Sequence, residues 1–204
     1  MTPERFRTIE QKTLELLKNY DFFFEKGWVS AELILEDLGY VITPLPGIQQ
    51  RTRNAGLDTD AVTLLELREV VVDESLNGNP RYNFTIAHEL GHIILHPDEY
   101  ASCTNLDDFV TAFEAFQTSR KENEANTFAR LLLMPDRLIY PPISSFLDKL
   151  PDDAIQAMKQ DIESAIEYTS THFCRQFHVS ASALKWRLKE TNYPRVRELI
   201  QNLS

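Results

Sequence analysis

Three residues near the middle of the chain have the types and the spacing of a metal site. His88, Glu89 and His92 form the pattern H-E-x-x-H. In a helix, residues four apart lie above one another on one face, so two imidazoles can hold one metal ion from the same side. Glu89 can then accept a proton from a water molecule beside that ion. Because imidazole is a good zinc ligand and zinc lowers the pKa of water to about 7, the pattern predicts a hydrolytic zinc site.

The residues that flank this motif indicate a helix with one apolar face. Ile86, Leu90, Ile93 and Ile94 recur at helical spacing, so one side can pack on a core while the histidines lie elsewhere. Pro97 ends such a helix soon after the motif. The same letters also occur by chance in helices with ordinary surface or core histidines, so the prediction depends on a third ligand.

His96 is one candidate for the third ligand, because it lies four residues after His92. A straight helix rises about 1.5 Å per residue, which places His88 and His96 about 12 Å apart along its axis. One ion cannot contact both unless the helix breaks between His92 and His96, and no glycine or proline lies there. We therefore interpret His96 as a helix-end residue or as a partner of a ligand.

A second helix, predicted from about residue 119 to Pro135, carries two glutamates that can serve as ligands, Glu122 and Glu124. Both lie beside the apolar face, so the amphipathic pattern does not separate them. The small residues Ala125 and Ala129 mark where this helix can approach another closely, and Glu122 projects nearer to that edge. Glu122 is therefore predicted to be the ligand, and Glu124 a solvated helix charge.

Two residues near Glu122 in the sequence indicate different roles for it, a metal ligand or a helix cap. Asn126 lies four residues after Glu122, where its amide can hydrogen-bond a ligand side chain. Ser119 lies three residues before Glu122, and Ser-x-x-Glu is a capping-box pattern in which the glutamate only binds a backbone N–H. The upstream H-E-x-x-H favours the ligand over the cap.

Hydrophobic periodicity and turn residues predict a mostly helical α+β protein with a small, mainly antiparallel sheet. The expected helices cover residues 3–20, 30–38, 152–168, 171–177 and 180–190, and the expected strands cover residues 40–45, 62–67 and 69–73. Residues 47–60 are polar and turn-rich, and no element is assigned to them.

The strand expected at residues 69–73 precedes the motif helix and contains candidates for substrate binding, Val70, Val71 and Val72. A strand beside the active helix can pair with an extended peptide and hold it across the metal ion. An ordinary position inside the sheet is an equal alternative for each of these valines.

Composition and charge limit the classes of function. The chain has 204 residues and a formal net charge of -10, which disfavours direct binding to nucleic acid or to an acidic membrane. No apolar stretch has the length of a membrane span, and residues 1–12 lack the apolar run of a signal peptide. Cys103 and Cys174 are far apart in the sequence and are expected to be free thiols. Together these features predict a cytoplasmic protein.

The last predicted helix allows a DNA-binding interpretation, since Lys185, Arg187 and Lys189 follow a short turn at His178. Packing is the favoured interpretation, with the basic side chains on a solvated face. The residues expected to pack are Ala181, Leu184, Trp186 and Leu188.

Two segments in tandem resemble the ImmA/IrrE family of metallo-endopeptidases. One is Arg81–His96, and the other is Glu122–Pro135 with the pattern E-x-E-A-N-x-F-A-x-x-L-L-M-P. The similarity covers roughly residues 28–140, and two motifs in tandem are far more specific than H-E-x-x-H alone. We expect a zincin-like metallopeptidase domain over residues 1–140, including the N-terminal helix, and a C-terminal helical subdomain over residues 141–204.

This resemblance implies an intracellular zinc peptidase, with Zn²⁺ held by His88, His92 and Glu122 and with Glu89 as the catalytic base. Many family members cleave helix-turn-helix repressors of mobile elements or stress genes, so such a repressor is the expected substrate. The alternative is a peptidase fold that sequesters a regulator without cutting it. The candidates for stabilising the oxyanion are Tyr82, Tyr100, Tyr140 and His172.

Overall fold

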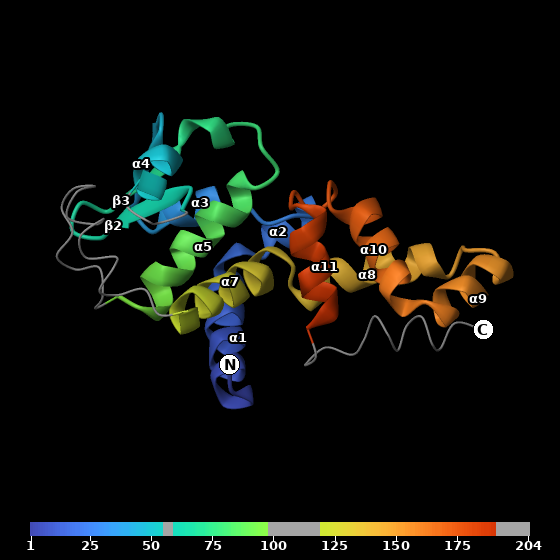
Figure 1. Ribbon diagram of the computed structural model, residues 1–204. Coiled ribbons are helices and arrows are strands. Elements are labelled where there is room, and N and C mark those ends of the chain that lie inside the picture. The colour runs from blue at the N-terminus through green and yellow to red at the C-terminus, as the bar shows by residue number, and fades with distance from the viewer. Residues whose placement is uncertain (55–58, 98–118, 191–204) are drawn as a thin grey trace. The chain divides into compact units, whose positions relative to one another are not determined.

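In the computed structural model the chain forms two compact units, whose helices and strands are drawn, and most of them labelled, in Figure 1. The residues that the structure describes are 1–54, 59–97 and 119–190. Unit 1 comprises Met1–Tyr20 and Ser30–Leu132, and unit 2 comprises Asp21–Val29 and the described residues from Leu133 onward. The fold class is mostly helical α+β, as predicted. Among the described helices, none has both the length and the apolar character needed to cross a membrane.

The helices of unit 1 follow local sequence signals. In chain order they are α1 (Pro3–Leu17), the 3₁₀ helix η1 (Lys18–Tyr20), α3 (Ala31–Asp37), α4 (Ile48–Asn54), the 3₁₀ helix η2 (Glu74–Leu76), α5 (Tyr82–Leu95) and α7 (Ser119–Leu133). Thr2 caps α1 by accepting a hydrogen bond from the backbone N–H of Arg5 at 3.3 Å. Ser30 caps α3 in the same way at Leu33, and Gly39 follows that helix with a φ of +83°. The predicted starts of both helices are therefore confirmed.

The sheet of unit 1 has three described strands, which are β1 (Val41–Leu45), β2 (Ala61–Leu64) and β3 (Glu69–Asp73). Their order is β1-β3-β2. β3 is antiparallel to β2, as expected for the predicted hairpin, but it is parallel to β1. The sheet is therefore mixed rather than mainly antiparallel, and β3 is its central strand.

This strand order corrects the substrate-strand prediction for Val70, Val71 and Val72. β3 pairs on both sides, and Val71, for example, is opposite Thr43 of β1 and Val62 of β2. A strand with neighbours on both sides has no backbone groups left for an added peptide. All three valines are buried, as expected for a strand that is covered on both faces.

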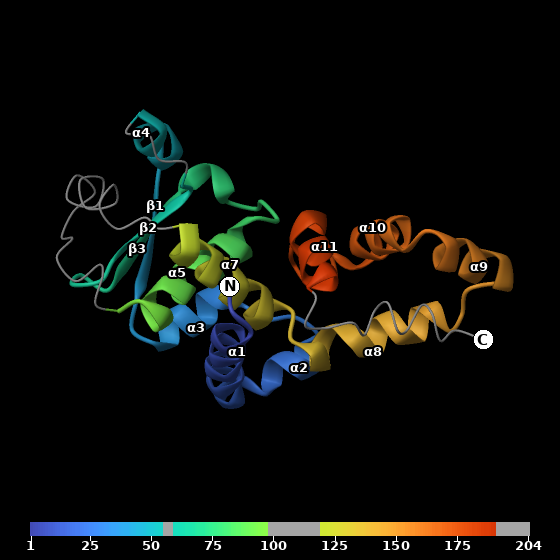
Figure 2. The same cartoon turned by 60° about the horizontal axis from the view of Figure 1, so that its bottom comes forward.

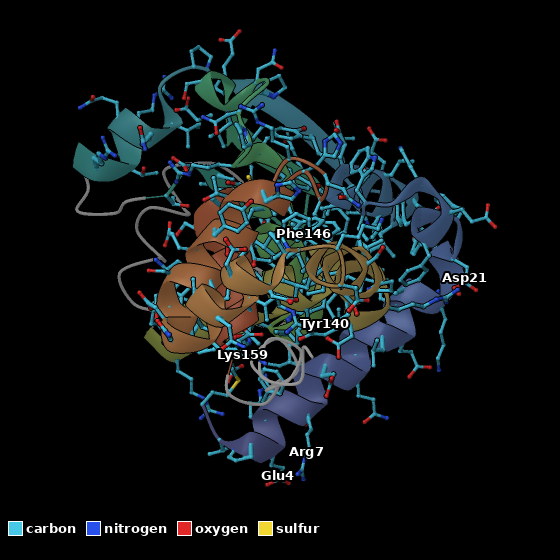
Figure 3. All side chains as sticks on the ribbon, turned by 90° about the vertical axis from the view of Figure 1, so that its right-hand side faces the viewer. Glu4, Arg7, Asp21, Tyr140, Phe146 and Lys159 are labelled. Atoms are coloured by element: carbon cyan, nitrogen blue, oxygen red, sulfur yellow. The ribbon has the colours of Figure 1, made fainter. Side chains whose placement is uncertain are left out.

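The described helices of unit 2 are α2 (Phe22–Lys26), α8 (Asp136–Leu147), α9 (Asp152–Gln160), α10 (Ile162–Phe173) and α11 (Ala181–Lys189). The single helix predicted over residues 152–168 is two helices, because the chain turns at Asp161, whose carboxylate caps α10 at Ser164 N–H at 3.0 Å. Phe146 of α8, labelled in Figure 3, stacks on His172 of α10 with ring centroids 4.4 Å apart. Cys174 after α10 is a free thiol, and Cys103 lies outside the described residues.

The predicted division of α11 into packing and solvated residues is wrong at two positions. The Arg187 side chain is 1% exposed, and it donates hydrogen bonds to the backbone oxygen of Met134 at 3.0 Å and to Asp136 at 2.6 Å. Trp186, expected to pack, is 64% exposed. Arg187 is buried because it binds Met134, which follows α7, and Asp136, which begins α8, and no local sequence pattern indicates these contacts.

The two lysines of α11 are also engaged within unit 2. Lys185 forms an ion pair with Glu167 of α10, and Lys189 forms one with Glu163 of the same helix. Each acidic partner cancels a charge that contact with a phosphate backbone would need. The contacts of α11 therefore favour packing over the DNA-binding interpretation.

Candidate metal centre

Helices α5 and α7 bring three potential metal ligands together. His88 and His92 lie one turn apart on α5, and Glu122 lies in the first turn of α7. The Nε2 atoms of the histidines are 3.0 Å apart. Glu122 Oε2 lies 3.2 Å from Nε2 of His88, and Glu122 Oε1 lies 3.3 Å from Nε2 of His92. Among the described residues, this is the one group of three or more acidic, histidine or cysteine side chains that could hold a metal ion.

The three separations fit a tetrahedral zinc ion. With zinc–ligand bonds of about 2.0–2.1 Å, the edge of a tetrahedron of ligand atoms is about 3.3 Å. Two Nε2 atoms at 3.0 Å repel each other unless a proton or a cation lies between their lone pairs. Two imidazoles and one carboxylate are also the donor set of a catalytic zinc site, which keeps a fourth position for water or substrate.

The charge of Glu122 suits a metal ligand. Burial raises the pKa of Glu122, but hydrogen bonds and charge interactions with the two histidines outweigh burial and hold that pKa well below its usual range. For His88, burial lowers the pKa, but the bond to Glu122 and the charge of Glu89 contribute more and raise the pKa above its usual value. A proton and a metal ion therefore compete for the same histidine nitrogen.

The two helices can lie this close because α5 has a glycine at the contact. Figures 1 and 2 show α5 and α7 side by side. A Cβ atom at Gly91 would lie 3.1 Å from the Cα of Ala125 and 3.2 Å from Cδ1 of Phe128. Ala125 is one of the small residues that were predicted to mark a close helix contact, and it faces this glycine.

We expect Gly91→Ala to weaken zinc binding, because the added methyl group must push Glu122 on α7 away from the histidines of α5. Alanine is the better helix former by about 1 kcal/mol. Overpacking of this kind costs about 1–3 kcal/mol, which outweighs that gain. Zinc titration against a competing chelator measures the effect. Wild-type affinity in the variant would show that the spacing of the two helices does not limit the site.

Asn126 orients the ring of His88. Its Oδ1 lies 3.2 Å from Nδ1 of His88. An amide oxygen can only accept, so Nδ1 carries a hydrogen, and in the neutral ring the lone pair is on Nε2, the nitrogen that faces Glu122 and His92. The four-residue spacing of Glu122 and Asn126 suggested that this amide contacts a ligand side chain, and the contact in the structure is with His88 of the other helix.

Asn126→Ala is expected to lower zinc affinity by about 10- to 100-fold, the usual cost of removing the partner that orients a histidine ligand. The matched control is Asn123→Ala, which makes the same change at an exposed position of the same helix and should leave zinc affinity unchanged. The measurement is again competition with a chelator. Equal affinities in the two variants would mean that the His88 ring is oriented by other contacts.

Glu89 is buried next to the metal group. Its Oε2 accepts a hydrogen bond from Oγ1 of Thr63 on β2 at 2.6 Å. Its negative charge contributes to the raised pKa of His88, so the carboxylate acts on the histidine at short range. Glu89 was predicted from its motif, whereas Thr63 was not, because no local pattern shows which strand residue faces α5.

The prediction that Glu124 is a solvated charge is wrong, because its side chain is only 2% exposed. Arg5 of α1 donates a hydrogen bond to Glu124 at 2.6 Å, and Arg120 donates one at 3.0 Å. His96 Nε2 lies 3.6 Å from Oε2 of the same carboxylate. His96 therefore belongs to a cluster with Glu124 and not to the metal group. The amphipathic pattern of α7 did not reveal this cluster, because Arg5 comes from a helix more than a hundred residues away.

We expect Glu124→Gln to lower the free energy of unfolding at pH 7 by about 2 kcal/mol, because it leaves Arg5 without its carboxylate. Burial raises the pKa of Glu124, but the hydrogen bonds from Arg5 and Arg120 outweigh burial and lower that pKa. Such a carboxylate stabilises the fold above its unfolded pKa of about 4.3, and this stability is lost as the pH falls through the folded pKa.

The difference between wild type and Glu124→Gln should therefore be complete at pH 7 and shrink below about pH 4. Chemical denaturation at several pH values measures it. Glu15→Gln is the control, because Glu15 is 71% exposed on α1 and its pair with Lys18 spans 3.9 Å, so stability should barely change. A difference for Glu124→Gln that stays constant with pH would rule out the ion-pair explanation.

The candidates for stabilising the oxyanion lie in different places. Tyr82 begins α5, and its hydroxyl donates to Glu32 at 3.2 Å. Burial and the charge of Glu32 raise the pKa of Tyr82 to about 12, so this hydroxyl keeps its proton at neutral pH. Tyr140 and His172 belong to unit 2, and Tyr100 lies outside the described residues. To stabilise an oxyanion, the Tyr82 hydroxyl would have to donate its hydrogen to that oxyanion instead of to Glu32.

Comparison with known proteins gives one match. The model of a family named Peptidase M78, described as the IrrE N-terminal-like domain, matches residues 35–189. This range includes the sheet, both helices of the metal group and most of the helices of unit 2, whereas α1 with Arg5 precedes it. No curated protein and no solved structure matches the chain.

Proposed function

Because the chain belongs to the Peptidase M78 family of IrrE N-terminal-like domains, we propose that it is a zinc-dependent endopeptidase of the cytoplasm. The family membership agrees with the ImmA/IrrE resemblance of its two sequence motifs. The observation that supports the proposal best is the metal group, in which His88, His92 and Glu122 place their donor atoms at the spacing of zinc ligands.

In the proposed mechanism, His88, His92 and Glu122 would hold the zinc ion, which would supply Lewis acidity for lowering the pKa of water and polarising the scissile carbonyl group. Glu89 accepts the proton of the attacking water and later delivers it to the leaving amine. Burial of Glu89 strengthens the electrostatic effect of its carboxylate. Asn126 keeps the His88 ring in the tautomer whose Nε2 lone pair is available to the ion.

An extended substrate peptide is proposed to pair with β2 rather than with β3. β2 is an edge strand of the described sheet, and its Thr63 contacts Glu89 of α5. A peptide added along this edge would lie beside the helix that carries the base, and the edge would first have to open, because every residue of β2 is at most 5% exposed. The other edge, β1, lies beyond β3 and contains Pro44, which has no N–H to donate to an added strand.

The proposed substrate is a helix-turn-helix repressor, because the resemblance to ImmA/IrrE peptidases suggests this class of partner. The formal net charge of -10 favours a protein substrate over direct contact with DNA. The ion pairs of Lys185 and Lys189 on α11 support the same choice.

The test is incubation of the zinc-loaded chain with helix-turn-helix repressors encoded near its gene, followed by mass spectrometry of the products. We expect defined fragments from cleavage at one site, and none after a chelator removes zinc. A repressor that stays intact but co-elutes with the chain would favour sequestration instead. A repressor that is neither cut nor bound would exclude this class of substrate.

A further inference from the structure

Thr63 is the one described residue that donates a hydrogen bond to the carboxylate of Glu89. Its Oγ1 lies 2.6 Å from Oε2 of Glu89. The contact is shielded from solvent, because Thr63 is 1% exposed and Glu89 is 6% exposed. A hydroxyl at this distance from an ionised carboxylate makes a short, charge-assisted hydrogen bond, roughly twice as strong as one between neutral groups.

This bond determines which oxygen of Glu89 is engaged by the protein. The terminal torsion of a glutamate is broad and roughly two-fold, so a carboxylate without a fixed partner rotates readily. Thr63 holds Oε2, whereas Oε1 has no hydrogen-bond donor within the described part of the chain. One oxygen is therefore fixed by the sheet, and the other can accept a proton.

Thr63 is itself held firmly in place. It lies opposite Val70 in the antiparallel register of β2 and β3, so its backbone is part of the sheet. Its β-branched side chain has few χ1 rotamers. The contact thus connects a paired strand to the residue that follows His88. Such positioning matters for catalysis, because a displacement of about 1 Å can lower a rate by about 100-fold.

We propose, on the premise of the peptidase function above, that Thr63 is the positioning residue of the general base. Its hydroxyl holds Oε2 of Glu89 and leaves Oε1 to take the proton from the attacking water. β2 then has two roles, since the strand proposed to pair with the peptide also orients the base. A contact that only stabilised the fold would affect unfolding but not kcat.

Thr63→Val removes the hydroxyl with little change of shape, and Thr63→Ser keeps it. We expect Thr63→Val to lower kcat by about 10- to 100-fold while KM and zinc content stay at wild-type values. Thr63→Ser should restore kcat to within about threefold of wild type, because the hydrogen bond is retained. The matched control is Thr43→Val on β1, where the lost hydroxyl donates to Glu69 and kcat should not change.

Infrared difference spectroscopy gives a readout that needs no substrate. Subtracting the spectrum of the same protein with Glu89→Gln isolates the carboxylate bands of Glu89. These bands should shift in Thr63→Val and stay in place in Thr63→Ser. Unshifted bands in Thr63→Val, or a zinc-loaded Thr63→Val enzyme with wild-type kcat, would overturn the proposal.

Failure of the proposed peptidase function can be distinguished from failure of the proposal for Thr63. If the zinc-loaded wild type cleaves nothing, the peptidase assignment fails and the role of Thr63 in catalysis fails with it. The infrared bands then still show whether Thr63 holds the Glu89 carboxylate. A zinc-loaded wild type that is active, together with a fully active Thr63→Val, overturns only the role of Thr63.

Discussion

Glu89→Gln is expected to bind zinc as the wild type does and to lose peptide cleavage, with kcat lower by about 100- to 10,000-fold. The amide has nearly the shape of the carboxylate, but it does not accept a proton at neutral pH. Thr63 can still donate to the amide oxygen, so the local packing is kept. Steady-state kinetics on any peptide that the wild type cleaves measures kcat, and metal analysis measures zinc.

The matched control for this change is Glu69→Gln. Glu69 lies on β3 of the same unit and accepts a hydrogen bond from Thr43, so the control also replaces a partly buried carboxylate that a threonine engages. The kcat of the Glu69→Gln variant should be close to that of the wild type. Cleavage at the native rate by Glu89→Gln would show that another group takes the proton.

Glu122→Gln is expected to weaken zinc binding by more than about 100-fold, which exceeds the usual cost of losing a residue that only orients a ligand. The change removes the one negative charge among the three donors and leaves His88 and His92 as the stronger ligands. Zinc titration against a chelator measures the affinity. Glutamine keeps the size of the side chain, so packing between α5 and α7 is preserved.

Glu124→Gln, two residues later on α7, is the matched control for Glu122→Gln. It should keep zinc affinity within about tenfold of wild type. It should instead destabilise the fold, since Glu124 binds Arg5 of α1. The two variants are therefore expected to show opposite defects. Loss of zinc in Glu124→Gln, with normal affinity in Glu122→Gln, would mean that the third ligand had been assigned to the wrong glutamate.

The metal group was predictable because its signals are local. His88, Glu89 and His92 fall within little more than one helical turn, and their chemistry is specific enough to recognise in one segment. Glu122 and Asn126 are four residues apart on one helix, so a ligand and a supporting amide could be proposed together. The structure brings the side chains of both segments into contact.

Two of the partners that the sequence did not reveal are distant in the chain. Arg5 meets Glu124 across 119 residues, and Thr63 meets Glu89 across 26. Such contacts depend on how elements pack, which hydrophobic periodicity within one helix or strand does not report. The same reason explains the exposed Trp186 and the buried Arg187 on α11.

The order of the strands was missed for a related reason. A run such as Val70–Val72 predicts a buried strand, but it does not say which strands lie on either side. The parallel pairing of β1 with β3 requires the chain to cross the sheet between them, and β2 occupies the other edge of β3. The sequence therefore could not show that β3 is paired on both sides, which is why the proposed substrate strand is β2 and not β3.

We propose that one zinc ion is held by two histidines of α5 and one glutamate of α7. Anomalous scattering from crystals of the zinc-loaded chain, measured on both sides of the zinc absorption edge, tests it most directly. We predict a single peak about 2.0–2.2 Å from Nε2 of His88, Nε2 of His92 and a carboxylate oxygen of Glu122. No peak at this position, or a peak whose third protein ligand is Glu124, would contradict the claim.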